Sequence, residues 1–217
     1  GRVEASLLRA RAYGGTVRTR LLMTAAAGAG APDLRWQLGL DRVNLTQARQ
    51  DSFGWVPFTG NATLQLALES TGTGREQILA GLSGRANLSL RAGELLGLSL
   101  SYIMRRSGSE PTILRLANEP RTRFETGQFA FSIQRGVVYL LDGDMTGSGF
   151  RANVSGQTSL IDRWVAASGA LSPTSGPARL VGFDISGVLA EPVLSSRPEL
   201  MLSPTAVDGA PPARLRR

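Results

Sequence analysis

The side chains of this chain that could take part in chemistry are carboxylates, hydroxyls and guanidiniums, because its 217 residues include no histidine, cysteine or lysine. Without imidazole there is no Ser-His-Asp triad, and without thiolate there is no cysteine nucleophile and no Cys-ligated zinc or iron–sulfur site. Without lysine there is no Schiff base and no P-loop lysine. An enzyme built from Asp, Glu, Ser, Tyr and Arg remains open. We expect instead a protein that is not an enzyme, with no catalytic residue, no metal ligand and no cofactor.

The acidic residues carry two weak site patterns. The Asp-Gly-Asp triplet at 142–144 is similar to a fragment of a calcium loop, but the EF-hand spacing and its closing Glu are missing. A hairpin turn is the preferred interpretation, because Asp-Gly favours positive φ. Four glutamates near predicted turns could form a carboxylate pair, although solvated turn charge is the simpler interpretation. These are Glu94, Glu110, Glu119 and Glu125.

Arginine supplies all 24 basic residues, and the formal net charge is +7. This usage is expected of a GC-rich genome, and the functional alternative is an anionic partner, either nucleic acid or lipid headgroups. The arginines are spread along the chain and are not interleaved with aromatic residues. That pattern is a weak signal for nucleic acid, so we predict no nucleic-acid partner.

Contact with a membrane has little support in the sequence itself. No run of about 18 apolar residues occurs, so no transmembrane helix is predicted, and no signal peptide opens the chain. The strand-like pattern begins at Arg2, which suggests a piece of something longer. An apolar loop at 53–58 is expected to plug one end of a sheet, with contact to a membrane surface or a partner as the alternative.

Alternation with period two dominates the chain, as in strands that bury one face. Leu64, Leu66 and Leu68 alternate with small or polar residues, and the same pattern recurs at Leu88 and Leu90. Such alternation is typical of an antiparallel sheet with one solvated side. Further examples are Phe129, Phe131 and Ile133, the series Trp36, Leu38 and Leu40, and the candidate strands 3–12, 16–26, 136–142, 149–160, 164–172 and 180–190.

Three segments lack this alternation and instead have apolar residues at helical spacing, which predicts short helices. They are residues 74–83, 94–106 and a turn near 113–117. The expected fold is therefore mainly β with a minor α+β character: a long curled antiparallel sheet or groove with two or three short covering helices. We expect one β-rich module over residues 1–197, followed by a mobile tail rich in Pro and Arg at 198–217.

Five motifs in order resemble the C-terminal region of the AsmA family of Gram-negative envelope proteins. They are AYGGTVRTRLLM at 12–23, LDRVNLTQ at 40–47, the long stretch 58–100, TRFETGQFAFSIQRGVV at 122–138 and FDISGVLAEPVL at 183–194. The second motif is similar to the family's strand that leads into a short helix, with Asn in place of the usual Asp. The order of the five carries the resemblance, because each motif alone is common in β proteins.

The resemblance implies a place and a role. AsmA-like proteins are anchored in the inner membrane by an N-terminal helix and extend into the periplasm as long curled sheets with an apolar groove. They are linked to phospholipid movement and outer-membrane integrity. By this resemblance the chain is a periplasmic module, anchored through a segment absent from it, and its partners are phospholipid acyl chains and other envelope proteins.

The alternating apolar residues are the candidate site, and two interpretations of them remain open. They line a lipid groove, or they form the dry core of a structural scaffold for other envelope proteins, since both surfaces show period-two apolar faces. A third class, an enzyme or carbohydrate-binding β protein, is disfavoured by the missing residue types. The groove candidates are Leu64, Leu66, Leu68, Leu88, Leu90, Phe129, Phe131 and Ile133.

Overall fold

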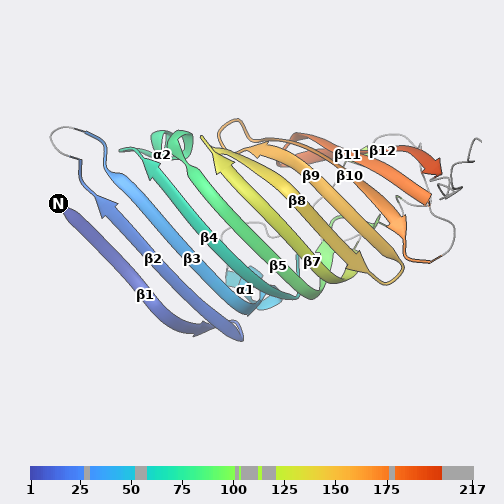
Figure 1. Ribbon diagram of the computed structural model, residues 1–217, viewed down its shortest axis with the longest axis horizontal. Coiled ribbons are helices and arrows are strands. Elements are labelled where there is room, and N and C mark those ends of the chain that lie inside the picture. The colour runs from blue at the N-terminus through green and yellow to red at the C-terminus, as the bar shows by residue number, and fades with distance from the viewer. Residues whose placement is uncertain are drawn as a thin grey trace, which may run out of the picture.

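One curved antiparallel sheet makes up almost all of the described protein (Figure 1). The mainly β, antiparallel class predicted from the alternation is confirmed. The structure is a computed structural model. It describes residues 1–26, 30–51, 58–100, 103, 112–113, 121–175 and 179–201.

Eleven strands of 10 to 14 residues and one two-residue strand build the sheet. They are β1 (Arg2–Ala12), β2 (Gly15–Thr24), β3 (Asp33–Asn44), β4 (Asn61–Thr71), β5 (Ser83–Leu96), β6 (Thr112–Ile113), β7 (Arg121–Gln134), β8 (Val137–Gly147), β9 (Phe150–Ser159), β10 (Trp164–Pro173), β11 (Arg179–Val188) and β12 (Glu191–Met201). Their order in the sheet is β1-β2-β3-β4-β5-β7-β8-β9-β10-β11-β12-β6. Long strands that follow one another in sequence therefore lie side by side, as in a meander.

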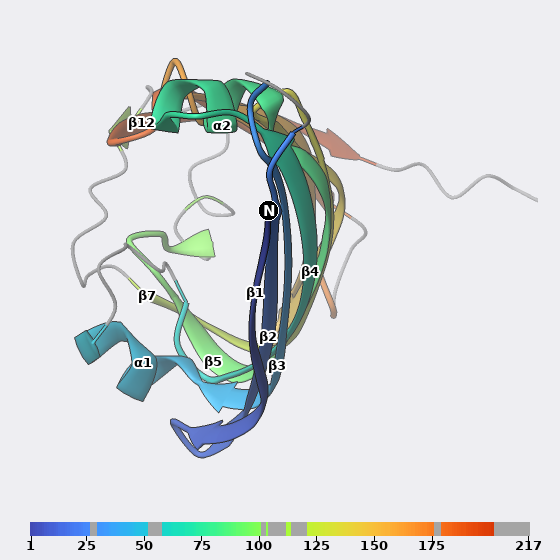
Figure 2. The ribbon, with the colours of Figure 1, turned by 90° about the vertical axis from the view of Figure 1, so that its left-hand side faces the viewer.

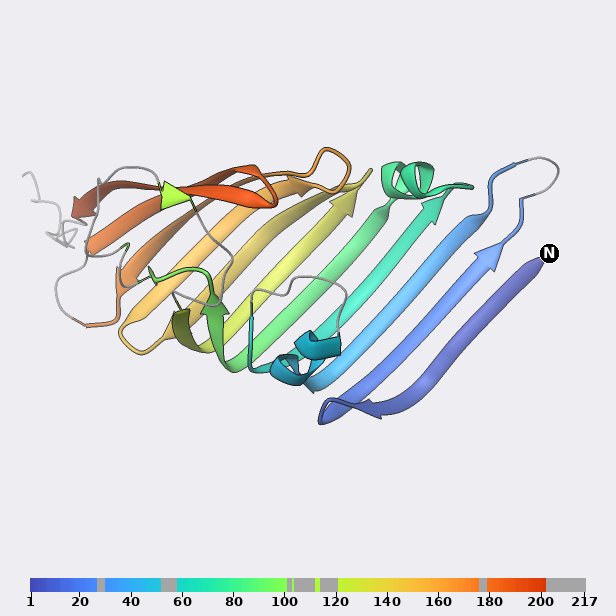
Figure 3. The ribbon, with the colours of Figure 1, turned by 180° about the vertical axis from the view of Figure 1, so that it is seen from behind.

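The sheet is curled into an open arch (Figure 2). Two helices occur in the described ranges, α1 (Leu45–Asp51) and α2 (Arg75–Gly81), and they lie at opposite ends of the strands. Viewed from behind, the concave side faces the reader, with α1 in front of the strands (Figure 3). The sheet does not close on itself, because β1 pairs with β2 only among the described strands.

The two faces of the sheet follow directly from the alternation in sequence. In β4, Leu64, Leu66 and Leu68 are half-buried on the concave face, whereas Gln65 and Ala67 are exposed on the convex face. Successive side chains of a strand point to opposite sides, so this one segment determines the orientation of its neighbours through the pairing register.

The buried core lies on the concave side, against the residues that follow β5, which are described at 97–100 and 103 and are called the returning segment. Leu100 and Ile103 from this returning segment are almost fully buried there. The core joins them to side chains of β4, β5 and β7 to β12, namely Ala62, Leu90, Phe124, Phe129, Met145, Phe150, Ala152, Leu171, Val181, Phe183 and Leu194.

The predicted helices are found in part. The helix expected at 74–83 is α2, but the segment expected to be helical at 94–106 begins as strand, since Glu94–Leu96 belong to β5 and pair with β7. Helical geometry begins at Leu100, and the N–H of Ile103 donates to the carbonyl of Ser99 (3.2 Å). Pairing with β7 overrides the helical spacing, because it satisfies the backbone of β5 along its whole length.

The Asp-Gly-Asp triplet at 142–144 is not a hairpin turn, and that prediction is wrong. It lies inside β8, next to a shift of register between Leu140 and Gly143. The turn before β8 uses Arg135 and Gly136 instead, both with positive φ (49° and 75°). Gly143 is required for a different reason, because a Cβ there would lie 2.9 Å from Cδ1 of Phe129.

Several other predictions fall at the limits of the described residues. The expected module boundary at residue 197 lies inside β12, and residues 202–217 lie outside the described ranges. Of the helical turn expected at 113–117, only Ile113 is described, and it belongs to β6. Of the loop at 53–58, only Phe58 is described, and it packs against the core.

Candidate functional site

Cross-strand pairing places all eight candidate residues on the concave face. Each row of paired residues crosses β4, β5 and β7, and neighbouring strands lie about 4.8 Å apart, so the side chains form one continuous apolar surface. From the α1 end to the α2 end the rows are Ala62–Leu90–Gly127, Leu64–Leu88–Phe129, Leu66–Ala86–Phe131 and Leu68–Gly84–Ile133.

The eight candidates divide by burial. Leu90, Phe129 and Ile133 are buried, and the first two belong to the closed core. The other five are only half-buried: Leu64, Leu66, Leu68, Leu88 and Phe131. The same apolar face is therefore a dry core in one part and accessible to solvent in another.

Aromatic packing closes the face beside α1. The ring of Phe58 lies 6.2 Å from that of Phe124, nearly perpendicular to it, and 5.7 Å from that of Phe129. The rings of Phe129 and Phe131 are stacked at 6.4 Å. These contacts fill the concavity over β5 and β7, where Leu100 and Ile103 also pack.

A buried threonine fixes the segment that covers this part of the face. The hydroxyl of Thr122 in β7 donates to the carbonyl of Leu98 (2.6 Å) and accepts from the N–H of Leu100 (2.9 Å). Both backbone groups lie in a buried region, where an unmade hydrogen bond is costly. Thr122 therefore holds the returning segment against the sheet.

The apolar face continues beyond the predicted candidates, across β3, β2 and β1. Here five large apolar side chains are exposed on the concave side, because no described element covers these strands. These five residues were not among the candidates, although the alternation at 16–26 and at Trp36 could have indicated some of them. They are Val3, Leu7, Leu21, Met23 and Trp36, between 39% and 66% exposed.

The exposed part is long enough to matter for a ligand. One row of paired residues, from Leu7 through Leu38 and Leu66 to Phe131, crosses six strands. Five spacings of about 4.8 Å make the row about 24 Å long, whereas each leaflet of a bilayer holds acyl chains over about 15 Å. Ala86 and Phe131 at one end of the row are buried or packed against the core, and the four positions on β1 to β4 span about 14 Å, close to the depth of acyl chain in one leaflet.

One polar group interrupts this row, and its hydrogen bonds are satisfied. The hydroxyl of Thr19 accepts from Nε1 of Trp36 (2.8 Å) and donates to the backbone carbonyl of Gln37 (3.1 Å). These bonds also fix the orientation of the indole on the concave face. Thr19 can thus lie beneath an apolar ligand without leaving an unpaired donor.

None of the eight candidate side chains ionises, so these residues can bind apolar groups by burial but supply no acid or base themselves. Glu94, one of the four glutamates in the possible carboxylate pair, forms ion pairs with Arg121 (3.2 Å) and Arg123 (3.4 Å) instead. Within the described ranges no three acidic side chains are grouped so as to hold a metal ion.

Comparisons with known proteins identify no relative: no protein-family model, curated protein or solved structure matches the chain. No helix in the described part of the chain is both long and apolar enough to span a bilayer. The concave face of the sheet is thus the feature on which a functional interpretation depends.

Proposed function

We propose that this chain is a lipid-binding module of an AsmA-like envelope protein, and that its concave face receives phospholipid acyl chains. The observation that carries the proposal is the uncovered apolar surface of β1 to β4, on which Leu21 and Trp36 are exposed although they face the inside of the arch. Exposed apolar surface of this extent marks an interaction site. The five motifs that resemble the family support the same role.

The energetics favour an acyl chain as the occupant. Eight methylenes of a C16 chain, each stabilised by about 0.8 kcal/mol on burial, contribute about 6 kcal/mol before the cost of ordering the chain. The open side of the arch leaves the polar headgroup in water while the chain lies on the sheet. Such binding needs no charged side chain on the concave face.

The proposed setting follows the resemblance. The module lies in the periplasm as part of a protein anchored in the inner membrane through a segment outside this chain, and it contributes to outer-membrane biogenesis. Phospholipid is its ligand, other envelope proteins are its partners, and no catalysis is part of the role. The alternative role is an envelope scaffold that binds no lipid.

Photo-crosslinking distinguishes the two roles. A photoreactive residue is placed at Leu66 or Trp36 on the concave face, and at Ser89 or Arg35, which are exposed on the convex face, as matched controls. After incubation with vesicles of radiolabelled phosphatidylethanolamine, we expect lipid adducts from the concave positions and few from the convex ones. A folded protein that gives equal or no adducts at the four positions supports the scaffold role instead.

A charged substitution provides an independent test. Leu66→Asp places a carboxylate in the middle of the apolar row, where burial against an acyl chain is strongly unfavourable. We expect this substitution to abolish the lipid adducts formed by a photoreactive residue in place of Trp36, while the far-UV circular dichroism spectrum remains that of a β protein. Ser89→Asp, which adds the same charge to the convex face, should leave the adducts unchanged.

A further inference from the structure

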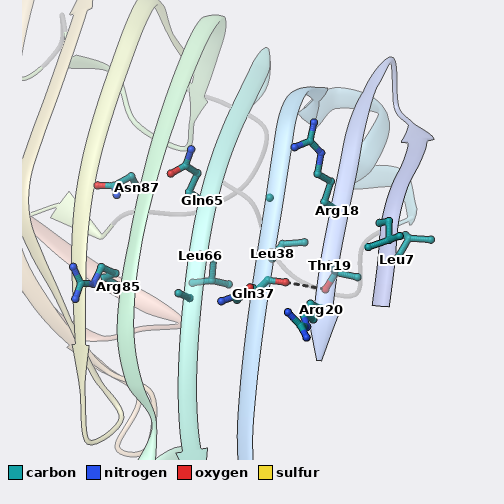
Figure 4. A pocket seen from close by; sticks show the side chains of 13 residues that line it. Leu7, Arg18, Thr19, Arg20, Gln37, Leu38, Gln65, Leu66, Arg85 and Asn87 are labelled. Carbon is teal, nitrogen blue, oxygen red and sulfur yellow. Dashed lines mark hydrogen bonds between the residues drawn. The ribbon is translucent and has the colours of Figure 1, made fainter. Parts of the chain in front are cut away.

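The convex face of β2 to β5 carries a grid of polar side chains around two small residues. The pairing register produces two neighbouring rows, each crossing the four strands. The rows are Arg18–Gly39–Gln65–Asn87 and Arg20–Gln37–Ala67–Arg85. By this register Gly39 and Ala67 occupy the middle of the grid. The longer side chains around them, which can donate hydrogen bonds, are labelled in Figure 4.

The small residues leave a hollow of about 470 Å³ in this face. A Cβ added to Gly39 would meet no atom within 4 Å, so the space above this residue is open. The hollow is lined by three arginines, three side-chain amides and no carboxylate. Leu7, Leu8, Leu38 and Leu66 also line it, so donors without a fixed negative charge stand among apolar residues, and the donors are the groups that an anion requires.

Two of the three guanidiniums are not neutralised. The guanidinium of Arg20 donates to Glu4 in β1 (2.8 Å). For Arg18 and Arg85, no carboxylate of the described residues lies within ion-pair distance. They stand on β2 and β5 in different rows, about 14 Å apart across the strands and about 7 Å apart along them, or about 16 Å in all, and their side chains are long enough to reach the space above Gly39.

We propose that this hollow is a binding site for a phosphate group, held between Arg18 and Arg85 over Gly39. Phosphate matches the forked geometry of guanidinium and accepts several hydrogen bonds at once, so the amides of Gln37, Gln65 and Asn87 complete the site. The site lies on the face of the sheet opposite to the acyl-chain surface, and it does not depend on the role proposed for that surface. The phosphate belongs to a lipid headgroup or to a free phosphate compound.

Titration with inorganic phosphate tests the site directly. In ¹⁵N-resolved spectra of the whole chain, we expect phosphate to shift the amide resonance of Gly39, and sodium chloride at equal ionic strength not to do so. The double variant Arg18→Gln, Arg85→Gln should weaken phosphate binding by at least about tenfold, because two charge-assisted contacts are lost. Gly39→Val should weaken it as well, by filling the hollow without changing the charge.

Arg91→Gln is the matched control for charge. Arg91 is exposed on the same face of β5, about 20 Å along the strand from Arg85, and does not line the hollow. We expect this variant to change phosphate affinity by less than about twofold. The proposal is overturned if Gly39 does not respond to phosphate, or if Arg91→Gln weakens binding as much as Arg85→Gln does.

Vesicle binding identifies the source of the phosphate. Leu8, which is 82% exposed, lies at the margin of the hollow and could insert among lipids. If the ligand is a headgroup, vesicles of phosphatidylglycerol should sediment the protein, and both Leu8→Ser and Arg85→Gln should reduce this binding. If it is a free phosphate compound, inorganic phosphate still shifts Gly39 while the vesicles bind no protein. Vesicle binding that is unchanged in Arg18→Gln and Arg85→Gln argues against the site.

Discussion

At the scale of single residues, Asn44 joins a strand to a helix. Its Oδ1 accepts hydrogen bonds from the backbone N–H groups of Thr46 (3.0 Å) and Gln47 (3.2 Å), which are free donors at the start of α1. We predict that Asn44→Ala lowers the free energy of unfolding by about 1 kcal/mol, whereas Asn44→Asp retains most of it. Urea denaturation measures both variants, and equal losses for Ala and Asp would contradict a capping role.

We predict opposite effects on stability when Gly143 and Gly39 are each replaced by alanine. A Cβ on Gly143 would lie 2.9 Å from Phe129 and 3.0 Å from Val154, whereas a Cβ on Gly39 would meet nothing. Gly143→Ala should therefore destabilise the protein by about 1–3 kcal/mol through overpacking. Gly39→Ala should leave stability unchanged or raise it slightly, because it removes conformational freedom from the unfolded chain. Thermal unfolding of the two variants side by side tests this difference.

At the scale of elements, the returning segment after β5 depends on Thr122. Thr122→Val keeps the shape of the side chain but removes its hydrogen bonds to Leu98 and Leu100. We predict that the free energy of unfolding falls by about 2 kcal/mol and that hydrogen exchange at the amide of Leu100 becomes faster. Thr126→Val, which removes only an exposed hydrogen bond between Thr126 and Thr146 in β8 (2.7 Å), is the control; it should cost less stability than Thr122→Val and leave the exchange of Leu100 unchanged. Unchanged exchange at Leu100 in Thr122→Val would show that packing alone holds the segment.

At the scale of the whole molecule, the concave face is closed at one end of the sheet and open at the other. Leu90, which is 1% exposed, lies in the closed part, and Leu21, which is 39% exposed, lies in the open part. We predict that Leu90→Ala costs about 2–5 kcal/mol, since it leaves a cavity in the core. Leu21→Ala should cost less than about 1 kcal/mol but should reduce lipid adducts. Comparable losses of stability would mean that both parts of the face are core.

The fold class, and the fact that the candidate residues of one strand share one face, follow from local features of the sequence. Period-two alternation is a local property, so Leu64, Leu66 and Leu68 had to share one side of a strand whatever the strand paired with. The start of α1 after Asn44 was equally local, because a cap acts within one turn of helix. The antiparallel sheet, most of its strands and α2 could therefore be predicted.

The tertiary structure decided which parts of that face are covered and what lies on the other side. Leu90 and Leu21 both lie on the apolar side of a strand, but Leu90 joins the core cluster with Leu100 and Ile103, whereas Leu21 is exposed. Arg18 and Arg85 are 67 positions apart in sequence, and they share a hollow only through the register of four strands. Coverage and register depend on contacts between distant parts of the chain, which local patterns do not contain.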